Sequence, residues 1–301
     1  MSDRRRAAAV PSPSLLRERV LHWYAVSARP LPWRDAACSP WGVLVSEVMS
    51  HQTPVARVEP VWREWMSRWP TPADLAAESP GEVVRAWGRL GYPRRALRLR
   101  ESAVAIVEHH GGEVPADEDA LRSLPGVGAY TAAAVAAFAF ERRAVVVDTN
   151  IRRVLARAVQ GRAFAAPALT AAESALAASL VPADPATSAT WNVAVMELGA
   201  LVCSARSPRC DECPVLDLCA WVAAGRPADD GPPRRGQAWH GTDRQVRGAI
   251  LQRLRESQGP VARSVLEAAG PDAAQVDRCL ASLVEDGLLE PAGPDRYCLP
   301  T

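Results

Sequence analysis

The chain has 301 residues, of which 48% are hydrophobic, and its formal net charge is +1. A chain of this length corresponds to about two domains, and its hydrophobic content excludes wholesale disorder. The longest nearly continuous apolar run, Tyr130 to Phe140, is too short to cross a bilayer. Residues 1–10 contain an arginine cluster, Arg4 to Arg6, but no apolar segment long enough for a secretory signal. We therefore expect a soluble, cytoplasmic protein with no membrane partner.

Every one of the 35 basic residues is an arginine, so the chain has no lysine. Without a side-chain amine, lysine-based imine chemistry is excluded. A net charge near zero also means that no global basic field attracts nucleic acid. A nucleic-acid partner would therefore have to be bound by local patches.

Helix-length segments punctuated by proline and glycine run along most of the sequence. Alternating strand patterns are almost absent before the C-terminal end of the chain. The fold is therefore predicted to be mainly α-helical, with helices at Leu15–Ser27, Pro60–Trp69, Gly81–Leu90, Arg95–His109 and Ala172–Leu180.

A carboxyl group stands in an apolar setting in the segment Trp41–Gln52. If this segment is a helix, one of its faces carries Leu44, Glu47, Val48 and His51. A carboxyl among valine and leucine should have a raised pKa and stay protonated near neutral pH, as a general acid must. The alternative is an exposed glutamate on a surface helix.

Two glycines mark a tight hairpin in the sequence LPGVGAYTA, residues 124–132. One helix is predicted to end near Leu121, and an apolar helical run begins at Thr131. Glycines let the backbone approach a ligand closely, and the first N–H groups of the second helix point toward an anion. The segment therefore favours a helix-hairpin-helix whose Gly126 and Gly128 hold a DNA phosphate without reading sequence. An ordinary corner between two helices is the alternative.

Asp148 follows the apolar run Val145–Val147 and precedes Thr149 and Asn150. It is placed to open a helix. Because Asp, Thr and Asn all cap helices well, an N-cap is the simplest interpretation. A catalytic carboxylate is the alternative.

Four of the seven cysteines follow the spacing Cys203-x6-Cys210-x2-Cys213-x5-Cys219. In a chain with no export signal, such a cluster favours a metal site over disulfides. Soft thiolate ligands select zinc or iron–sulfur centres. Structural zinc usually uses two close cysteine pairs with a longer gap between them, whereas this compact set suits a four-iron cluster held by four cysteines. A zinc knuckle is the alternative.

Residues 225–241 are rich in proline, glycine and arginine and are predicted to be a linker. Beyond it, Asp243–Ser257, Val261–Ala269 and Asp272–Asp286 have helical patterns. Leu288–Pro300 is compatible with a short hairpin. Three helices and a hairpin indicate a winged helix, with a small interaction module as the alternative.

These four signals, in this order, resemble those of the helix-hairpin-helix DNA glycosylases that carry an iron–sulfur cluster. The sequence is most similar to the MutY adenine DNA glycosylases, over about Leu15 to Ala224. Further matching segments are LPWR at 31–34, SEVM at 46–49 with QT at 52–53, LGY at 90–92 and MELGA at 196–200. The resemblance implies a mainly α, two-lobed glycosylase fold with a small C-terminal winged-helix-like domain.

The resemblance also implies how the chain is divided. A six-helix module with the hairpin would cover residues 34–144. An iron–sulfur module would combine 1–33 with 145–224 and hold one 4Fe–4S cluster on Cys203, Cys210, Cys213 and Cys219. The linker 225–241 would lead to a small domain at 242–301, which has no pattern of the NUDIX-like domain that many family members carry. The chain therefore resembles the short form of the family.

Catalytic roles follow from the same resemblance. Glu47 matches the family's catalytic acid and would protonate N7 of a flipped-out adenine. Asp148, in its ionised form, would stabilise or trap the oxocarbenium-like sugar, and Tyr130 and Asn150 would orient the carboxylates and water. Tyr130 stands where endonuclease III-like enzymes place a lysine nucleophile. The sequence therefore favours a monofunctional glycosylase that leaves an abasic site.

Substrate contacts are implied as well. Gln52 and Tyr92 would wedge into the base stack of double-stranded DNA that contains adenine opposite 8-oxoguanine or guanine, bound by a monomer. The family usually has Leu-Gln where this chain has Ser50-His51, so altered base choice, or an endonuclease III-like activity, is an alternative. A non-enzymatic iron–sulfur DNA-binding regulator is another. The adenine pocket would be lined by Arg29, Leu31, Trp33, Arg34 and Glu197.

Overall fold

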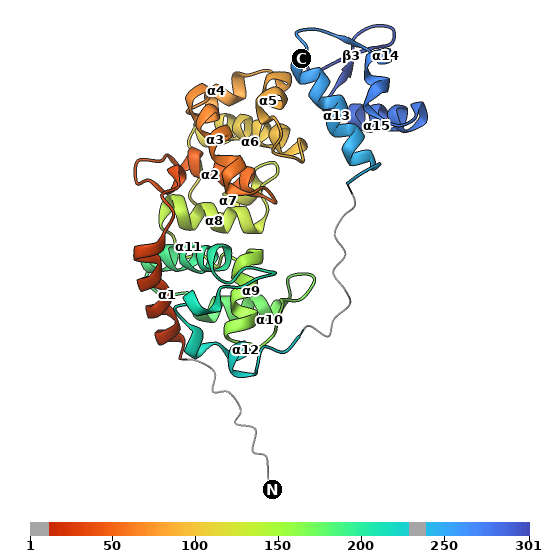
Figure 1. The fold of residues 1–301 in the computed structure, drawn as a ribbon. Helices are drawn as coiled ribbons and strands as arrows, with labels where there is room; N and C mark the ends of the chain where they lie inside the picture. Colours follow the sequence, from red (N-terminus) through yellow and green to blue (C-terminus); the bar gives the residue numbers. More distant parts are fainter. Residues whose placement is uncertain (1–11, 229–238) are drawn as a thin grey trace. The chain divides into compact units, whose positions relative to one another are not determined.

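Helices form most of the chain, as the sequence pattern predicts (Figure 1). The computed structural model describes residues 12–228 and 239–301. The cluster Arg4 to Arg6 and residues 229–238 of the predicted linker lie outside the described residues. The first eight α-helices are α1 (Pro13–Ser27), α2 (Pro40–Ser50), α3 (Val55–Arg68), α4 (Pro72–Ala77), α5 (Pro80–Trp87), α6 (Arg94–His110), α7 (Glu118–Ser123) and α8 (Ala129–Phe140).

The second half of the chain is also mainly helical and ends in a small sheet. Its α-helices are α9 (Thr149–Ala158), α10 (Ala171–Leu180), α11 (Pro185–Leu201), α12 (Ala220–Ala223), α13 (Asp243–Glu256), α14 (Arg263–Leu266) and α15 (Ala273–Glu285). The 3-10 turns are η1 (Pro32–Arg34), η2 (Cys210–Glu212), η3 (Leu216–Leu218) and η4 (Glu267–Ala269). The strands are β1 (Val261–Ala262), β2 (Glu290–Pro291) and β3 (Arg296–Cys298).

The described residues pack into two compact units. The first comprises residues 12–40, 116–119 and 128–228, and the second comprises 41–115, 120–127 and 239–301. In the first unit, α9 and α1 both pack on α11, and α8 packs there as well. The approach of α11 to the start of α9 is so close that a Cβ on Gly199 would lie 2.7 Å from the Cβ of Asn150. Only glycine permits that contact.

The second unit is built around a tryptophan cluster. The ring of Trp65 meets those of Trp69 and Trp87 edge to face, with centroids 4.9 Å and 5.5 Å apart. This geometry suits aromatic pairs because the positive ring edge faces the negative ring face. Helix α6 packs on α4 and on α5, the helix that carries Trp87. The helix predicted at Pro60 begins earlier, at Val55, so Pro60 lies inside α3, where one backbone N–H is missing.

The C-terminal part of the second unit is winged-helix-like. Helices α13 and α15 pack together, and a three-stranded antiparallel sheet of order β1-β3-β2 closes the domain. The prediction of a helix over Val261–Ala269 was wrong at its start, because Val261 and Ala262 pair with β3 as a strand. The expected hairpin is β2–β3, and its turn uses left-handed backbone at Gly293 and Asp295.

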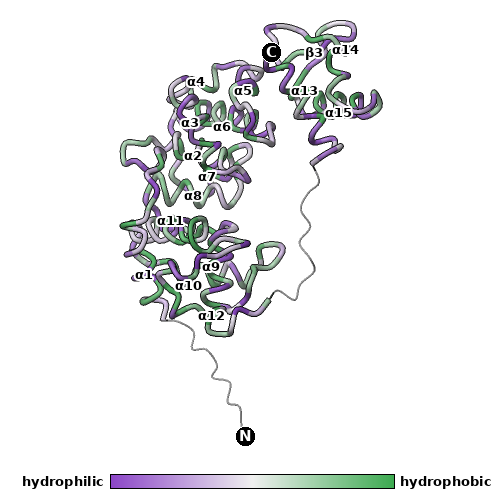
Figure 2. The backbone as a smooth tube through the Cα atoms, viewed as in Figure 1, coloured by the Kyte–Doolittle hydropathy of each residue, from purple (hydrophilic) through white to green (hydrophobic). Residues whose placement is uncertain are grey.

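Hydrophilic and hydrophobic stretches alternate along the helices of both units, as expected of helices with one buried face (Figure 2). None of the helices in the described part of the chain combines the length and apolar composition that a membrane span requires.

Candidate active site and cluster site

The predicted acidic helix is α2, and its carboxyl group is buried. Glu47 is 8% exposed, and every residue from Trp41 to Met49 on this helix is buried. A glutamate on an exposed helix face is therefore ruled out.

The C-terminal end of α2 is held by one arginine. Arg95 donates through Nη1 to the carbonyls of Val48 and Met49, at 2.7 and 3.1 Å. Through Nη2 it donates to the hydroxyl of Thr53 and the carbonyl of Gly91, at 3.1 and 2.9 Å. Burial lowers the pKa of Arg95 to about 10, so the guanidinium stays charged at neutral pH. Arg95 therefore joins the turn after α2 to the turn before α6.

The two predicted wedge residues lie in those two turns. Gln52 has φ 56° and Tyr92 has φ 47°, both in the left-handed region that non-glycine residues rarely adopt. Such strain is stored where surrounding contacts over-determine it, which happens often at functional sites. Tyr92 is 48% exposed, and its ring lies 5.7 Å from the Arg95 guanidinium carbon.

His51, one of the departures from the family pattern, lies directly after the end of α2 and before Gln52. Burial lowers its pKa, and the nearby positive charge of Arg95 acts in the same direction. The imidazole is therefore neutral at physiological pH.

Asp148 lies in the first unit and caps helix α9. Its Oδ1 accepts a hydrogen bond from the Ile151 backbone N–H at 2.6 Å, and its Oδ2 accepts one from Asn150 Nδ2 at 2.7 Å. The N-cap interpretation is therefore correct for its structure. Burial raises the pKa of Asp148, while these hydrogen bonds and the charge of Arg153 oppose the rise. The net effect is a raised pKa for Asp148, because burial is the largest cause and the hydrogen bonds only oppose it.

A polar chain connects Asp148 to the cysteine loop. Asn150 accepts, through Oδ1, a hydrogen bond from Arg153 Nη2 at 2.6 Å. Arg153 also donates to the carbonyls of Gly199 and Cys203, both at 2.6 Å. The residue that orients Asp148 is thus fixed by an arginine that also holds the backbone of the first cysteine.

Tyr130 sits in the first turn of α8 and is half-buried. It lines a cavity together with Val147, the residue before Asp148. Neither Asp148 nor Asn150 is among the residues that line this cavity.

The predicted adenine-pocket residues of the first unit converge on Glu197. This carboxylate is fully buried and accepts from Arg29 Nε and Nη2 at 2.7 and 2.6 Å, and from Arg34 Nη2 at 2.9 Å. Burial alone would raise the pKa of Glu197, but the hydrogen bonds and charges of the two arginines outweigh it and lower the pKa to about 2. Leu31 is buried and Trp33 is half-buried. Both lie in the segment between the two arginines.

Tyr24 belongs to the same group, although the sequence did not single it out. The Arg34 guanidinium carbon lies 5.9 Å from its ring centroid. Burial raises the pKa of Tyr24. No spacing or motif signal separates this tyrosine from an ordinary helix residue.

The glycine hairpin has the backbone that the sequence predicts. Gly126 has φ 78°, and a Cβ there would lie 2.8 Å from the Cβ of Arg98, so both conformation and packing require glycine. Gly128 is the N-cap of α8, and a Cβ on it would meet no atom within 4 Å. The backbone N–H groups that open α8 are therefore accessible from this side.

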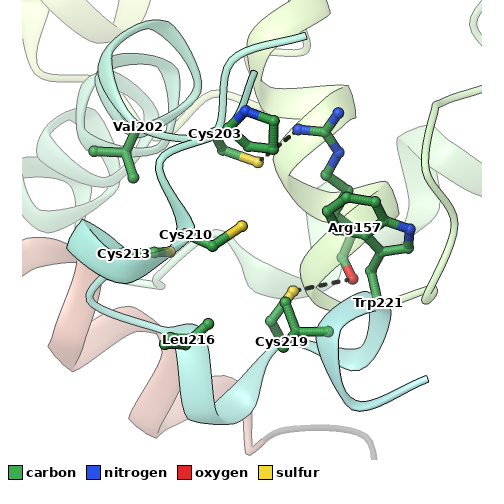
Figure 3. Close-up of a pocket in the computed structure, with 10 residues that line it drawn as sticks. Arg157, Val202, Cys203, Cys210, Cys213, Leu216, Cys219 and Trp221 are labelled. Carbon is green, nitrogen blue, oxygen red and sulfur yellow. Dashed lines mark hydrogen bonds between the residues drawn. The ribbon is translucent and has the colours of Figure 1, made fainter. Parts of the chain in front are cut away.

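The four clustered cysteines surround one cavity (Figure 3). Cys203, Cys210, Cys213 and Cys219 all line it, and its other lining is mostly apolar. In residues 12–228 and 239–301, no group of three or more His, Cys, Asp or Glu side chains is placed so that it could hold a metal ion. Burial raises the pKa of the Cys213 thiol to about 11.

Arg157 supports the cysteine loop from α9. It is 3% exposed and donates through Nη1 to Cys203 Sγ at 3.4 Å (Figure 3). The same nitrogen donates to the Ser204 carbonyl at 2.7 Å. Its guanidinium carbon lies 4.9 Å from the ring centroid of Trp221. Cys219 Sγ donates to the backbone carbonyl of Arg157 at 3.6 Å. An arginine charge beside the sulfurs stabilises thiolate ligands.

Within each unit, the structure groups the predicted residues as follows. The first unit contains Arg29, Leu31, Trp33, Arg34, Gly128, Tyr130, Asp148, Asn150, Glu197 and the four cysteines, and the second contains Glu47, Gln52, Tyr92 and Gly126. Sequence reasoning missed Arg95, Arg153 and Arg157. In a chain whose basic residues are all arginine, no local signal marks these three.

Comparison with known families matches two segments of the chain. Residues 45–177 match the HhH-GPD superfamily of base excision DNA repair proteins. Residues 203–219 match the iron-sulfur binding domain of endonuclease III.

The chain is also similar to curated proteins over most of its length. It is 52% identical over 298 residues to the adenine DNA glycosylase of Mycobacterium tuberculosis (strain ATCC 25618 / H37Rv), covering 97% of each chain. It is 44% identical over 215 residues to the adenine DNA glycosylase of Homo sapiens, covering 67% of this chain and 38% of the human protein.

Solved structures show the same fold. A thermostable thymine-DNA glycosylase has a TM-score of 0.62 and 28% identity, covering 69% of this chain and 95% of its own. A non-covalent complex of endonuclease III with DNA has a TM-score of 0.60 and 25% identity, covering 71% of this chain and 98% of its own.

Proposed function

Because this chain belongs to the family of adenine DNA glycosylases, we propose that it removes adenine mispaired with 8-oxoguanine or guanine from DNA during base excision repair. The observation that carries this proposal is the burial of the Glu47 carboxyl on the apolar helix α2. Its position matches the catalytic acid of the MutY pattern.

In this proposal Glu47 is the general acid. Adenine is a poor leaving group, so its departure requires protonation of N7. Adenine reaches the acid by rotating out of the duplex. In this role the Glu47 carboxyl carries the proton that the base accepts.

Asp148 is the second carboxyl of the reaction. The departing base leaves an oxocarbenium-like sugar, and a negative charge nearby stabilises this cation. The hydrogen bonds from Ile151 and Asn150 hold Asp148 in one orientation. Tyr130 and Asn150 orient the carboxylates and water. Two carboxyls of opposite protonation state are what this chemistry requires.

The remaining residues bind the substrate. The segment from Arg29 to Arg34, anchored on Glu197, forms the adenine pocket. Gln52 and Tyr92 enter the base stack beside the lesion, in turns that Arg95 fixes. Gly126 and Gly128 hold the phosphate backbone, and the open space beside Gly128 supports this role.

The four cysteines hold one 4Fe–4S cluster. The shared cavity and its mostly apolar lining fit a polynuclear centre held by the four sulfurs. When bound, the cluster supplies four iron–thiolate bonds that fix residues 203–219. Arg157 and Arg153 position the same loop through its sulfur and carbonyl groups.

The organisation of the protein is part of the proposal. The proposed division is a six-helix module at 34–144, an iron–sulfur module at 1–33 with 145–224, a linker at 225–241 and a C-terminal domain at 242–301. The two compact units described above divide the chain differently, because residues 34–40, 116–119 and 128–144 belong to the first unit. The enzyme acts as a cytoplasmic monomer on double-stranded DNA.

An excision panel tests the substrate. Duplexes with adenine opposite 8-oxoguanine, adenine opposite guanine and thymine opposite guanine are incubated with the protein and cleaved with alkali. We expect products from the first two. Ser50 and His51, which differ from the family pattern, favour the alternative of another base choice, and cleavage of the thymine duplex alone would establish that alternative.

A further inference from the structure

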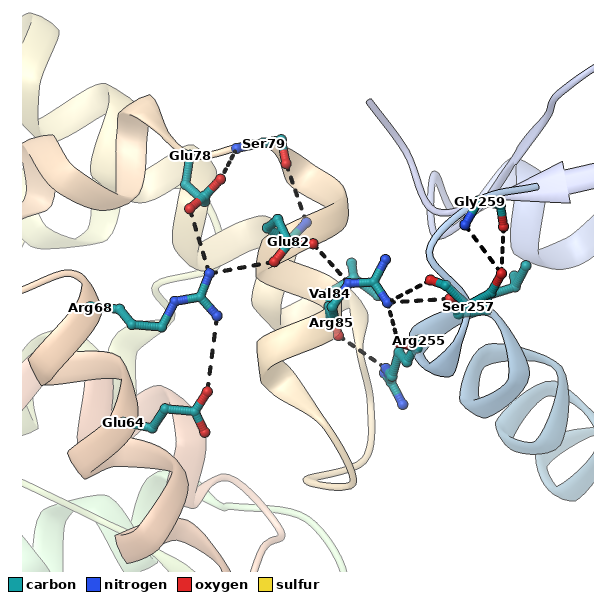
Figure 4. A network of polar contacts seen from close by, with 11 residues as sticks. Glu64, Arg68, Glu78, Ser79, Glu82, Val84, Arg85, Arg255, Ser257 and Gly259 are labelled. Atoms are coloured by element: carbon teal, nitrogen blue, oxygen red, sulfur yellow. Dashed lines mark hydrogen bonds and ion pairs between the residues drawn. The ribbon is translucent and has the colours of Figure 1, made fainter. Parts of the chain in front are cut away.

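The C-terminal domain, residues 242–301, is anchored on helix α5 of the same unit. Arg85 donates through Nη1 to the carbonyls of Arg255 and Ser257, the latter at 3.0 Å, and Arg255 donates back to the Val84 carbonyl at 3.0 Å (Figure 4). The Val84 side chain belongs to the domain's own apolar core. A Cβ on Gly81 would collide with the Pro300 carbonyl. This domain is therefore a fixed part of the second unit.

The docking creates a cavity of about 560 Å³ between the domain and the wedge turns. One wall carries Gln52 and Tyr92, and the opposite wall is the first half of α13, with Arg244 and Arg247. The cavity is therefore continuous with the residues proposed to enter the base stack.

Positive charge dominates this cavity. Five arginines line it, and its only lining carboxylate is Asp286. Asp286 is ion-paired with both Arg247 and Arg94, the latter at 3.1 Å. One negative charge therefore holds Arg94 and Arg247 in place. Because five arginines face a single carboxylate, the lining keeps a net positive charge.

The charge of the cavity differs from that of the domain that forms one of its walls. Residues 239–301 contain seven arginines and nine aspartates and glutamates, so the domain as a whole is acidic. Arg244 and Arg57 both line the cavity and are exposed, and Arg57 also donates through Nη2 to the Arg89 carbonyl. The Arg244 guanidinium carbon lies 4.9 Å from the ring centroid of Trp239, which is 47% exposed. An exposed arginine beside an aromatic ring is common where proteins bind nucleic acid.

We propose that this cavity binds a phosphodiester group of the DNA backbone next to the wedge, with Arg244 and Arg57 as its principal ligands. The proposal rests on the proposed function for the position of the duplex. Its chemistry follows from the lining itself, because guanidinium groups pair with phosphate oxygens through two parallel hydrogen bonds. Contacts of this kind set the register of the protein on the duplex without reading sequence. The small C-terminal domain then acts as a second DNA clamp.

The test measures binding of the full chain to a fully matched, fluorescently labelled duplex by anisotropy, at several salt concentrations. We expect Arg244→Gln to weaken binding several-fold at low salt, and the slope of log affinity against log salt to fall by about one. The double variant Arg57→Gln/Arg244→Gln should reduce the slope by about two. Arg253→Gln, on the same helix but outside the cavity lining, should match the wild type.

Two outcomes decide the matter. Wild-type affinity and salt slope in both the single and the double variant, with unchanged thermal unfolding, would overturn the proposal. Because a matched duplex is used, the result does not depend on base excision. If the wild type fails to excise adenine while Arg244→Gln still lowers the salt slope, the proposed function fails and the phosphate site stands.

Discussion

Arg29 binds the carboxylate of Glu197 through both of its oxygens, with Nε–Oε1 at 2.7 Å and Nη2–Oε2 at 2.6 Å. This bidentate pair fixes the start of the segment that contains Leu31 and Trp33 against helix α11. Because Glu197 itself is saturated by Arg29 and Arg34, its role is to position these arginines rather than to exchange protons. The low pKa of Glu197 makes this conclusion measurable.

The substitution Glu197→Gln should destabilise the protein in a pH-dependent way. The folded-state pKa of about 2 lies below the ordinary value of 4.5, so the carboxylate stabilises the fold above pH 4.5 and loses this contribution as the pH falls toward 2. The difference in the free energy of unfolding should be on the order of 3 kcal/mol at pH 7. Urea unfolding across this range measures it.

The matched control for Glu197 is Glu212→Gln, which breaks an exposed ion pair with Arg209 and should cost at most about 1 kcal/mol. A destabilisation by Glu197→Gln that stays constant from pH 7 to pH 3 would show that the carboxylate charge contributes nothing.

Replacing Arg95 with lysine should impair the wedge. A single ammonium cannot bond the end of α2 and the Gly91 turn at once, as the guanidinium does. We expect the single-turnover rate of adenine excision to fall by about tenfold or more, with a loss of stability of about 1–3 kcal/mol from unpaired carbonyls. Arg98→Lys, on the same helix in an exposed pair with Glu101, is the control. Equal excision rates for the two variants would mean that Arg95 does not position the wedge.

Arg153 should couple the candidate catalytic carboxylate to the cysteine loop. Arg153→Gln removes the charged donor to the Cys203 carbonyl and disturbs Asn150, the partner of Asp148. We expect both slower excision and a lower ratio of cluster absorbance to protein absorbance. Arg162→Gln, an exposed arginine nearby in sequence, should change neither quantity. Normal cluster content and a normal rate in Arg153→Gln would remove this link from the account.

The absence of lysine predicts the products. Borohydride traps an imine between an amine and an opened sugar, so the wild type should give no covalent adduct, and strands should break only after alkali treatment. Tyr130→Lys places an amine at the position of the endonuclease III nucleophile and should give an adduct on gels. Trapping by the wild type at the level of Tyr130→Lys would contradict a monofunctional reaction.

Local patterns allowed much of this structure to be predicted. The cysteine spacing predicted four thiols around one centre, because all four lie on a single short loop. The tight turn at Gly126 followed from glycine chemistry. The sequence left open whether Glu47 is buried or exposed, and the structure shows that it is buried. The helix expected at Val261 was wrong because a strand of two residues forms only through pairing with β3, and that partner is distant in sequence.

Polar contacts between residues far apart in the sequence could not be predicted for a related reason. Arg95 contacts Val48 and Met49, and Arg153 contacts Cys203. Neither pairing leaves a periodic trace in the sequence. The two interpretations of Asp148 also could not be separated beforehand, since the capping geometry is present and is compatible with a catalytic role.

The most direct test of the account is the single-turnover rate of adenine excision by Glu47→Gln and by Asp148→Asn, on a duplex with adenine opposite 8-oxoguanine. Each variant should be slower than the wild type by about 10²–10⁴-fold while binding the duplex and retaining its fold. Excision at the wild-type rate by either variant would contradict the assignment of a neutral acid at position 47 and an ionised carboxylate at position 148.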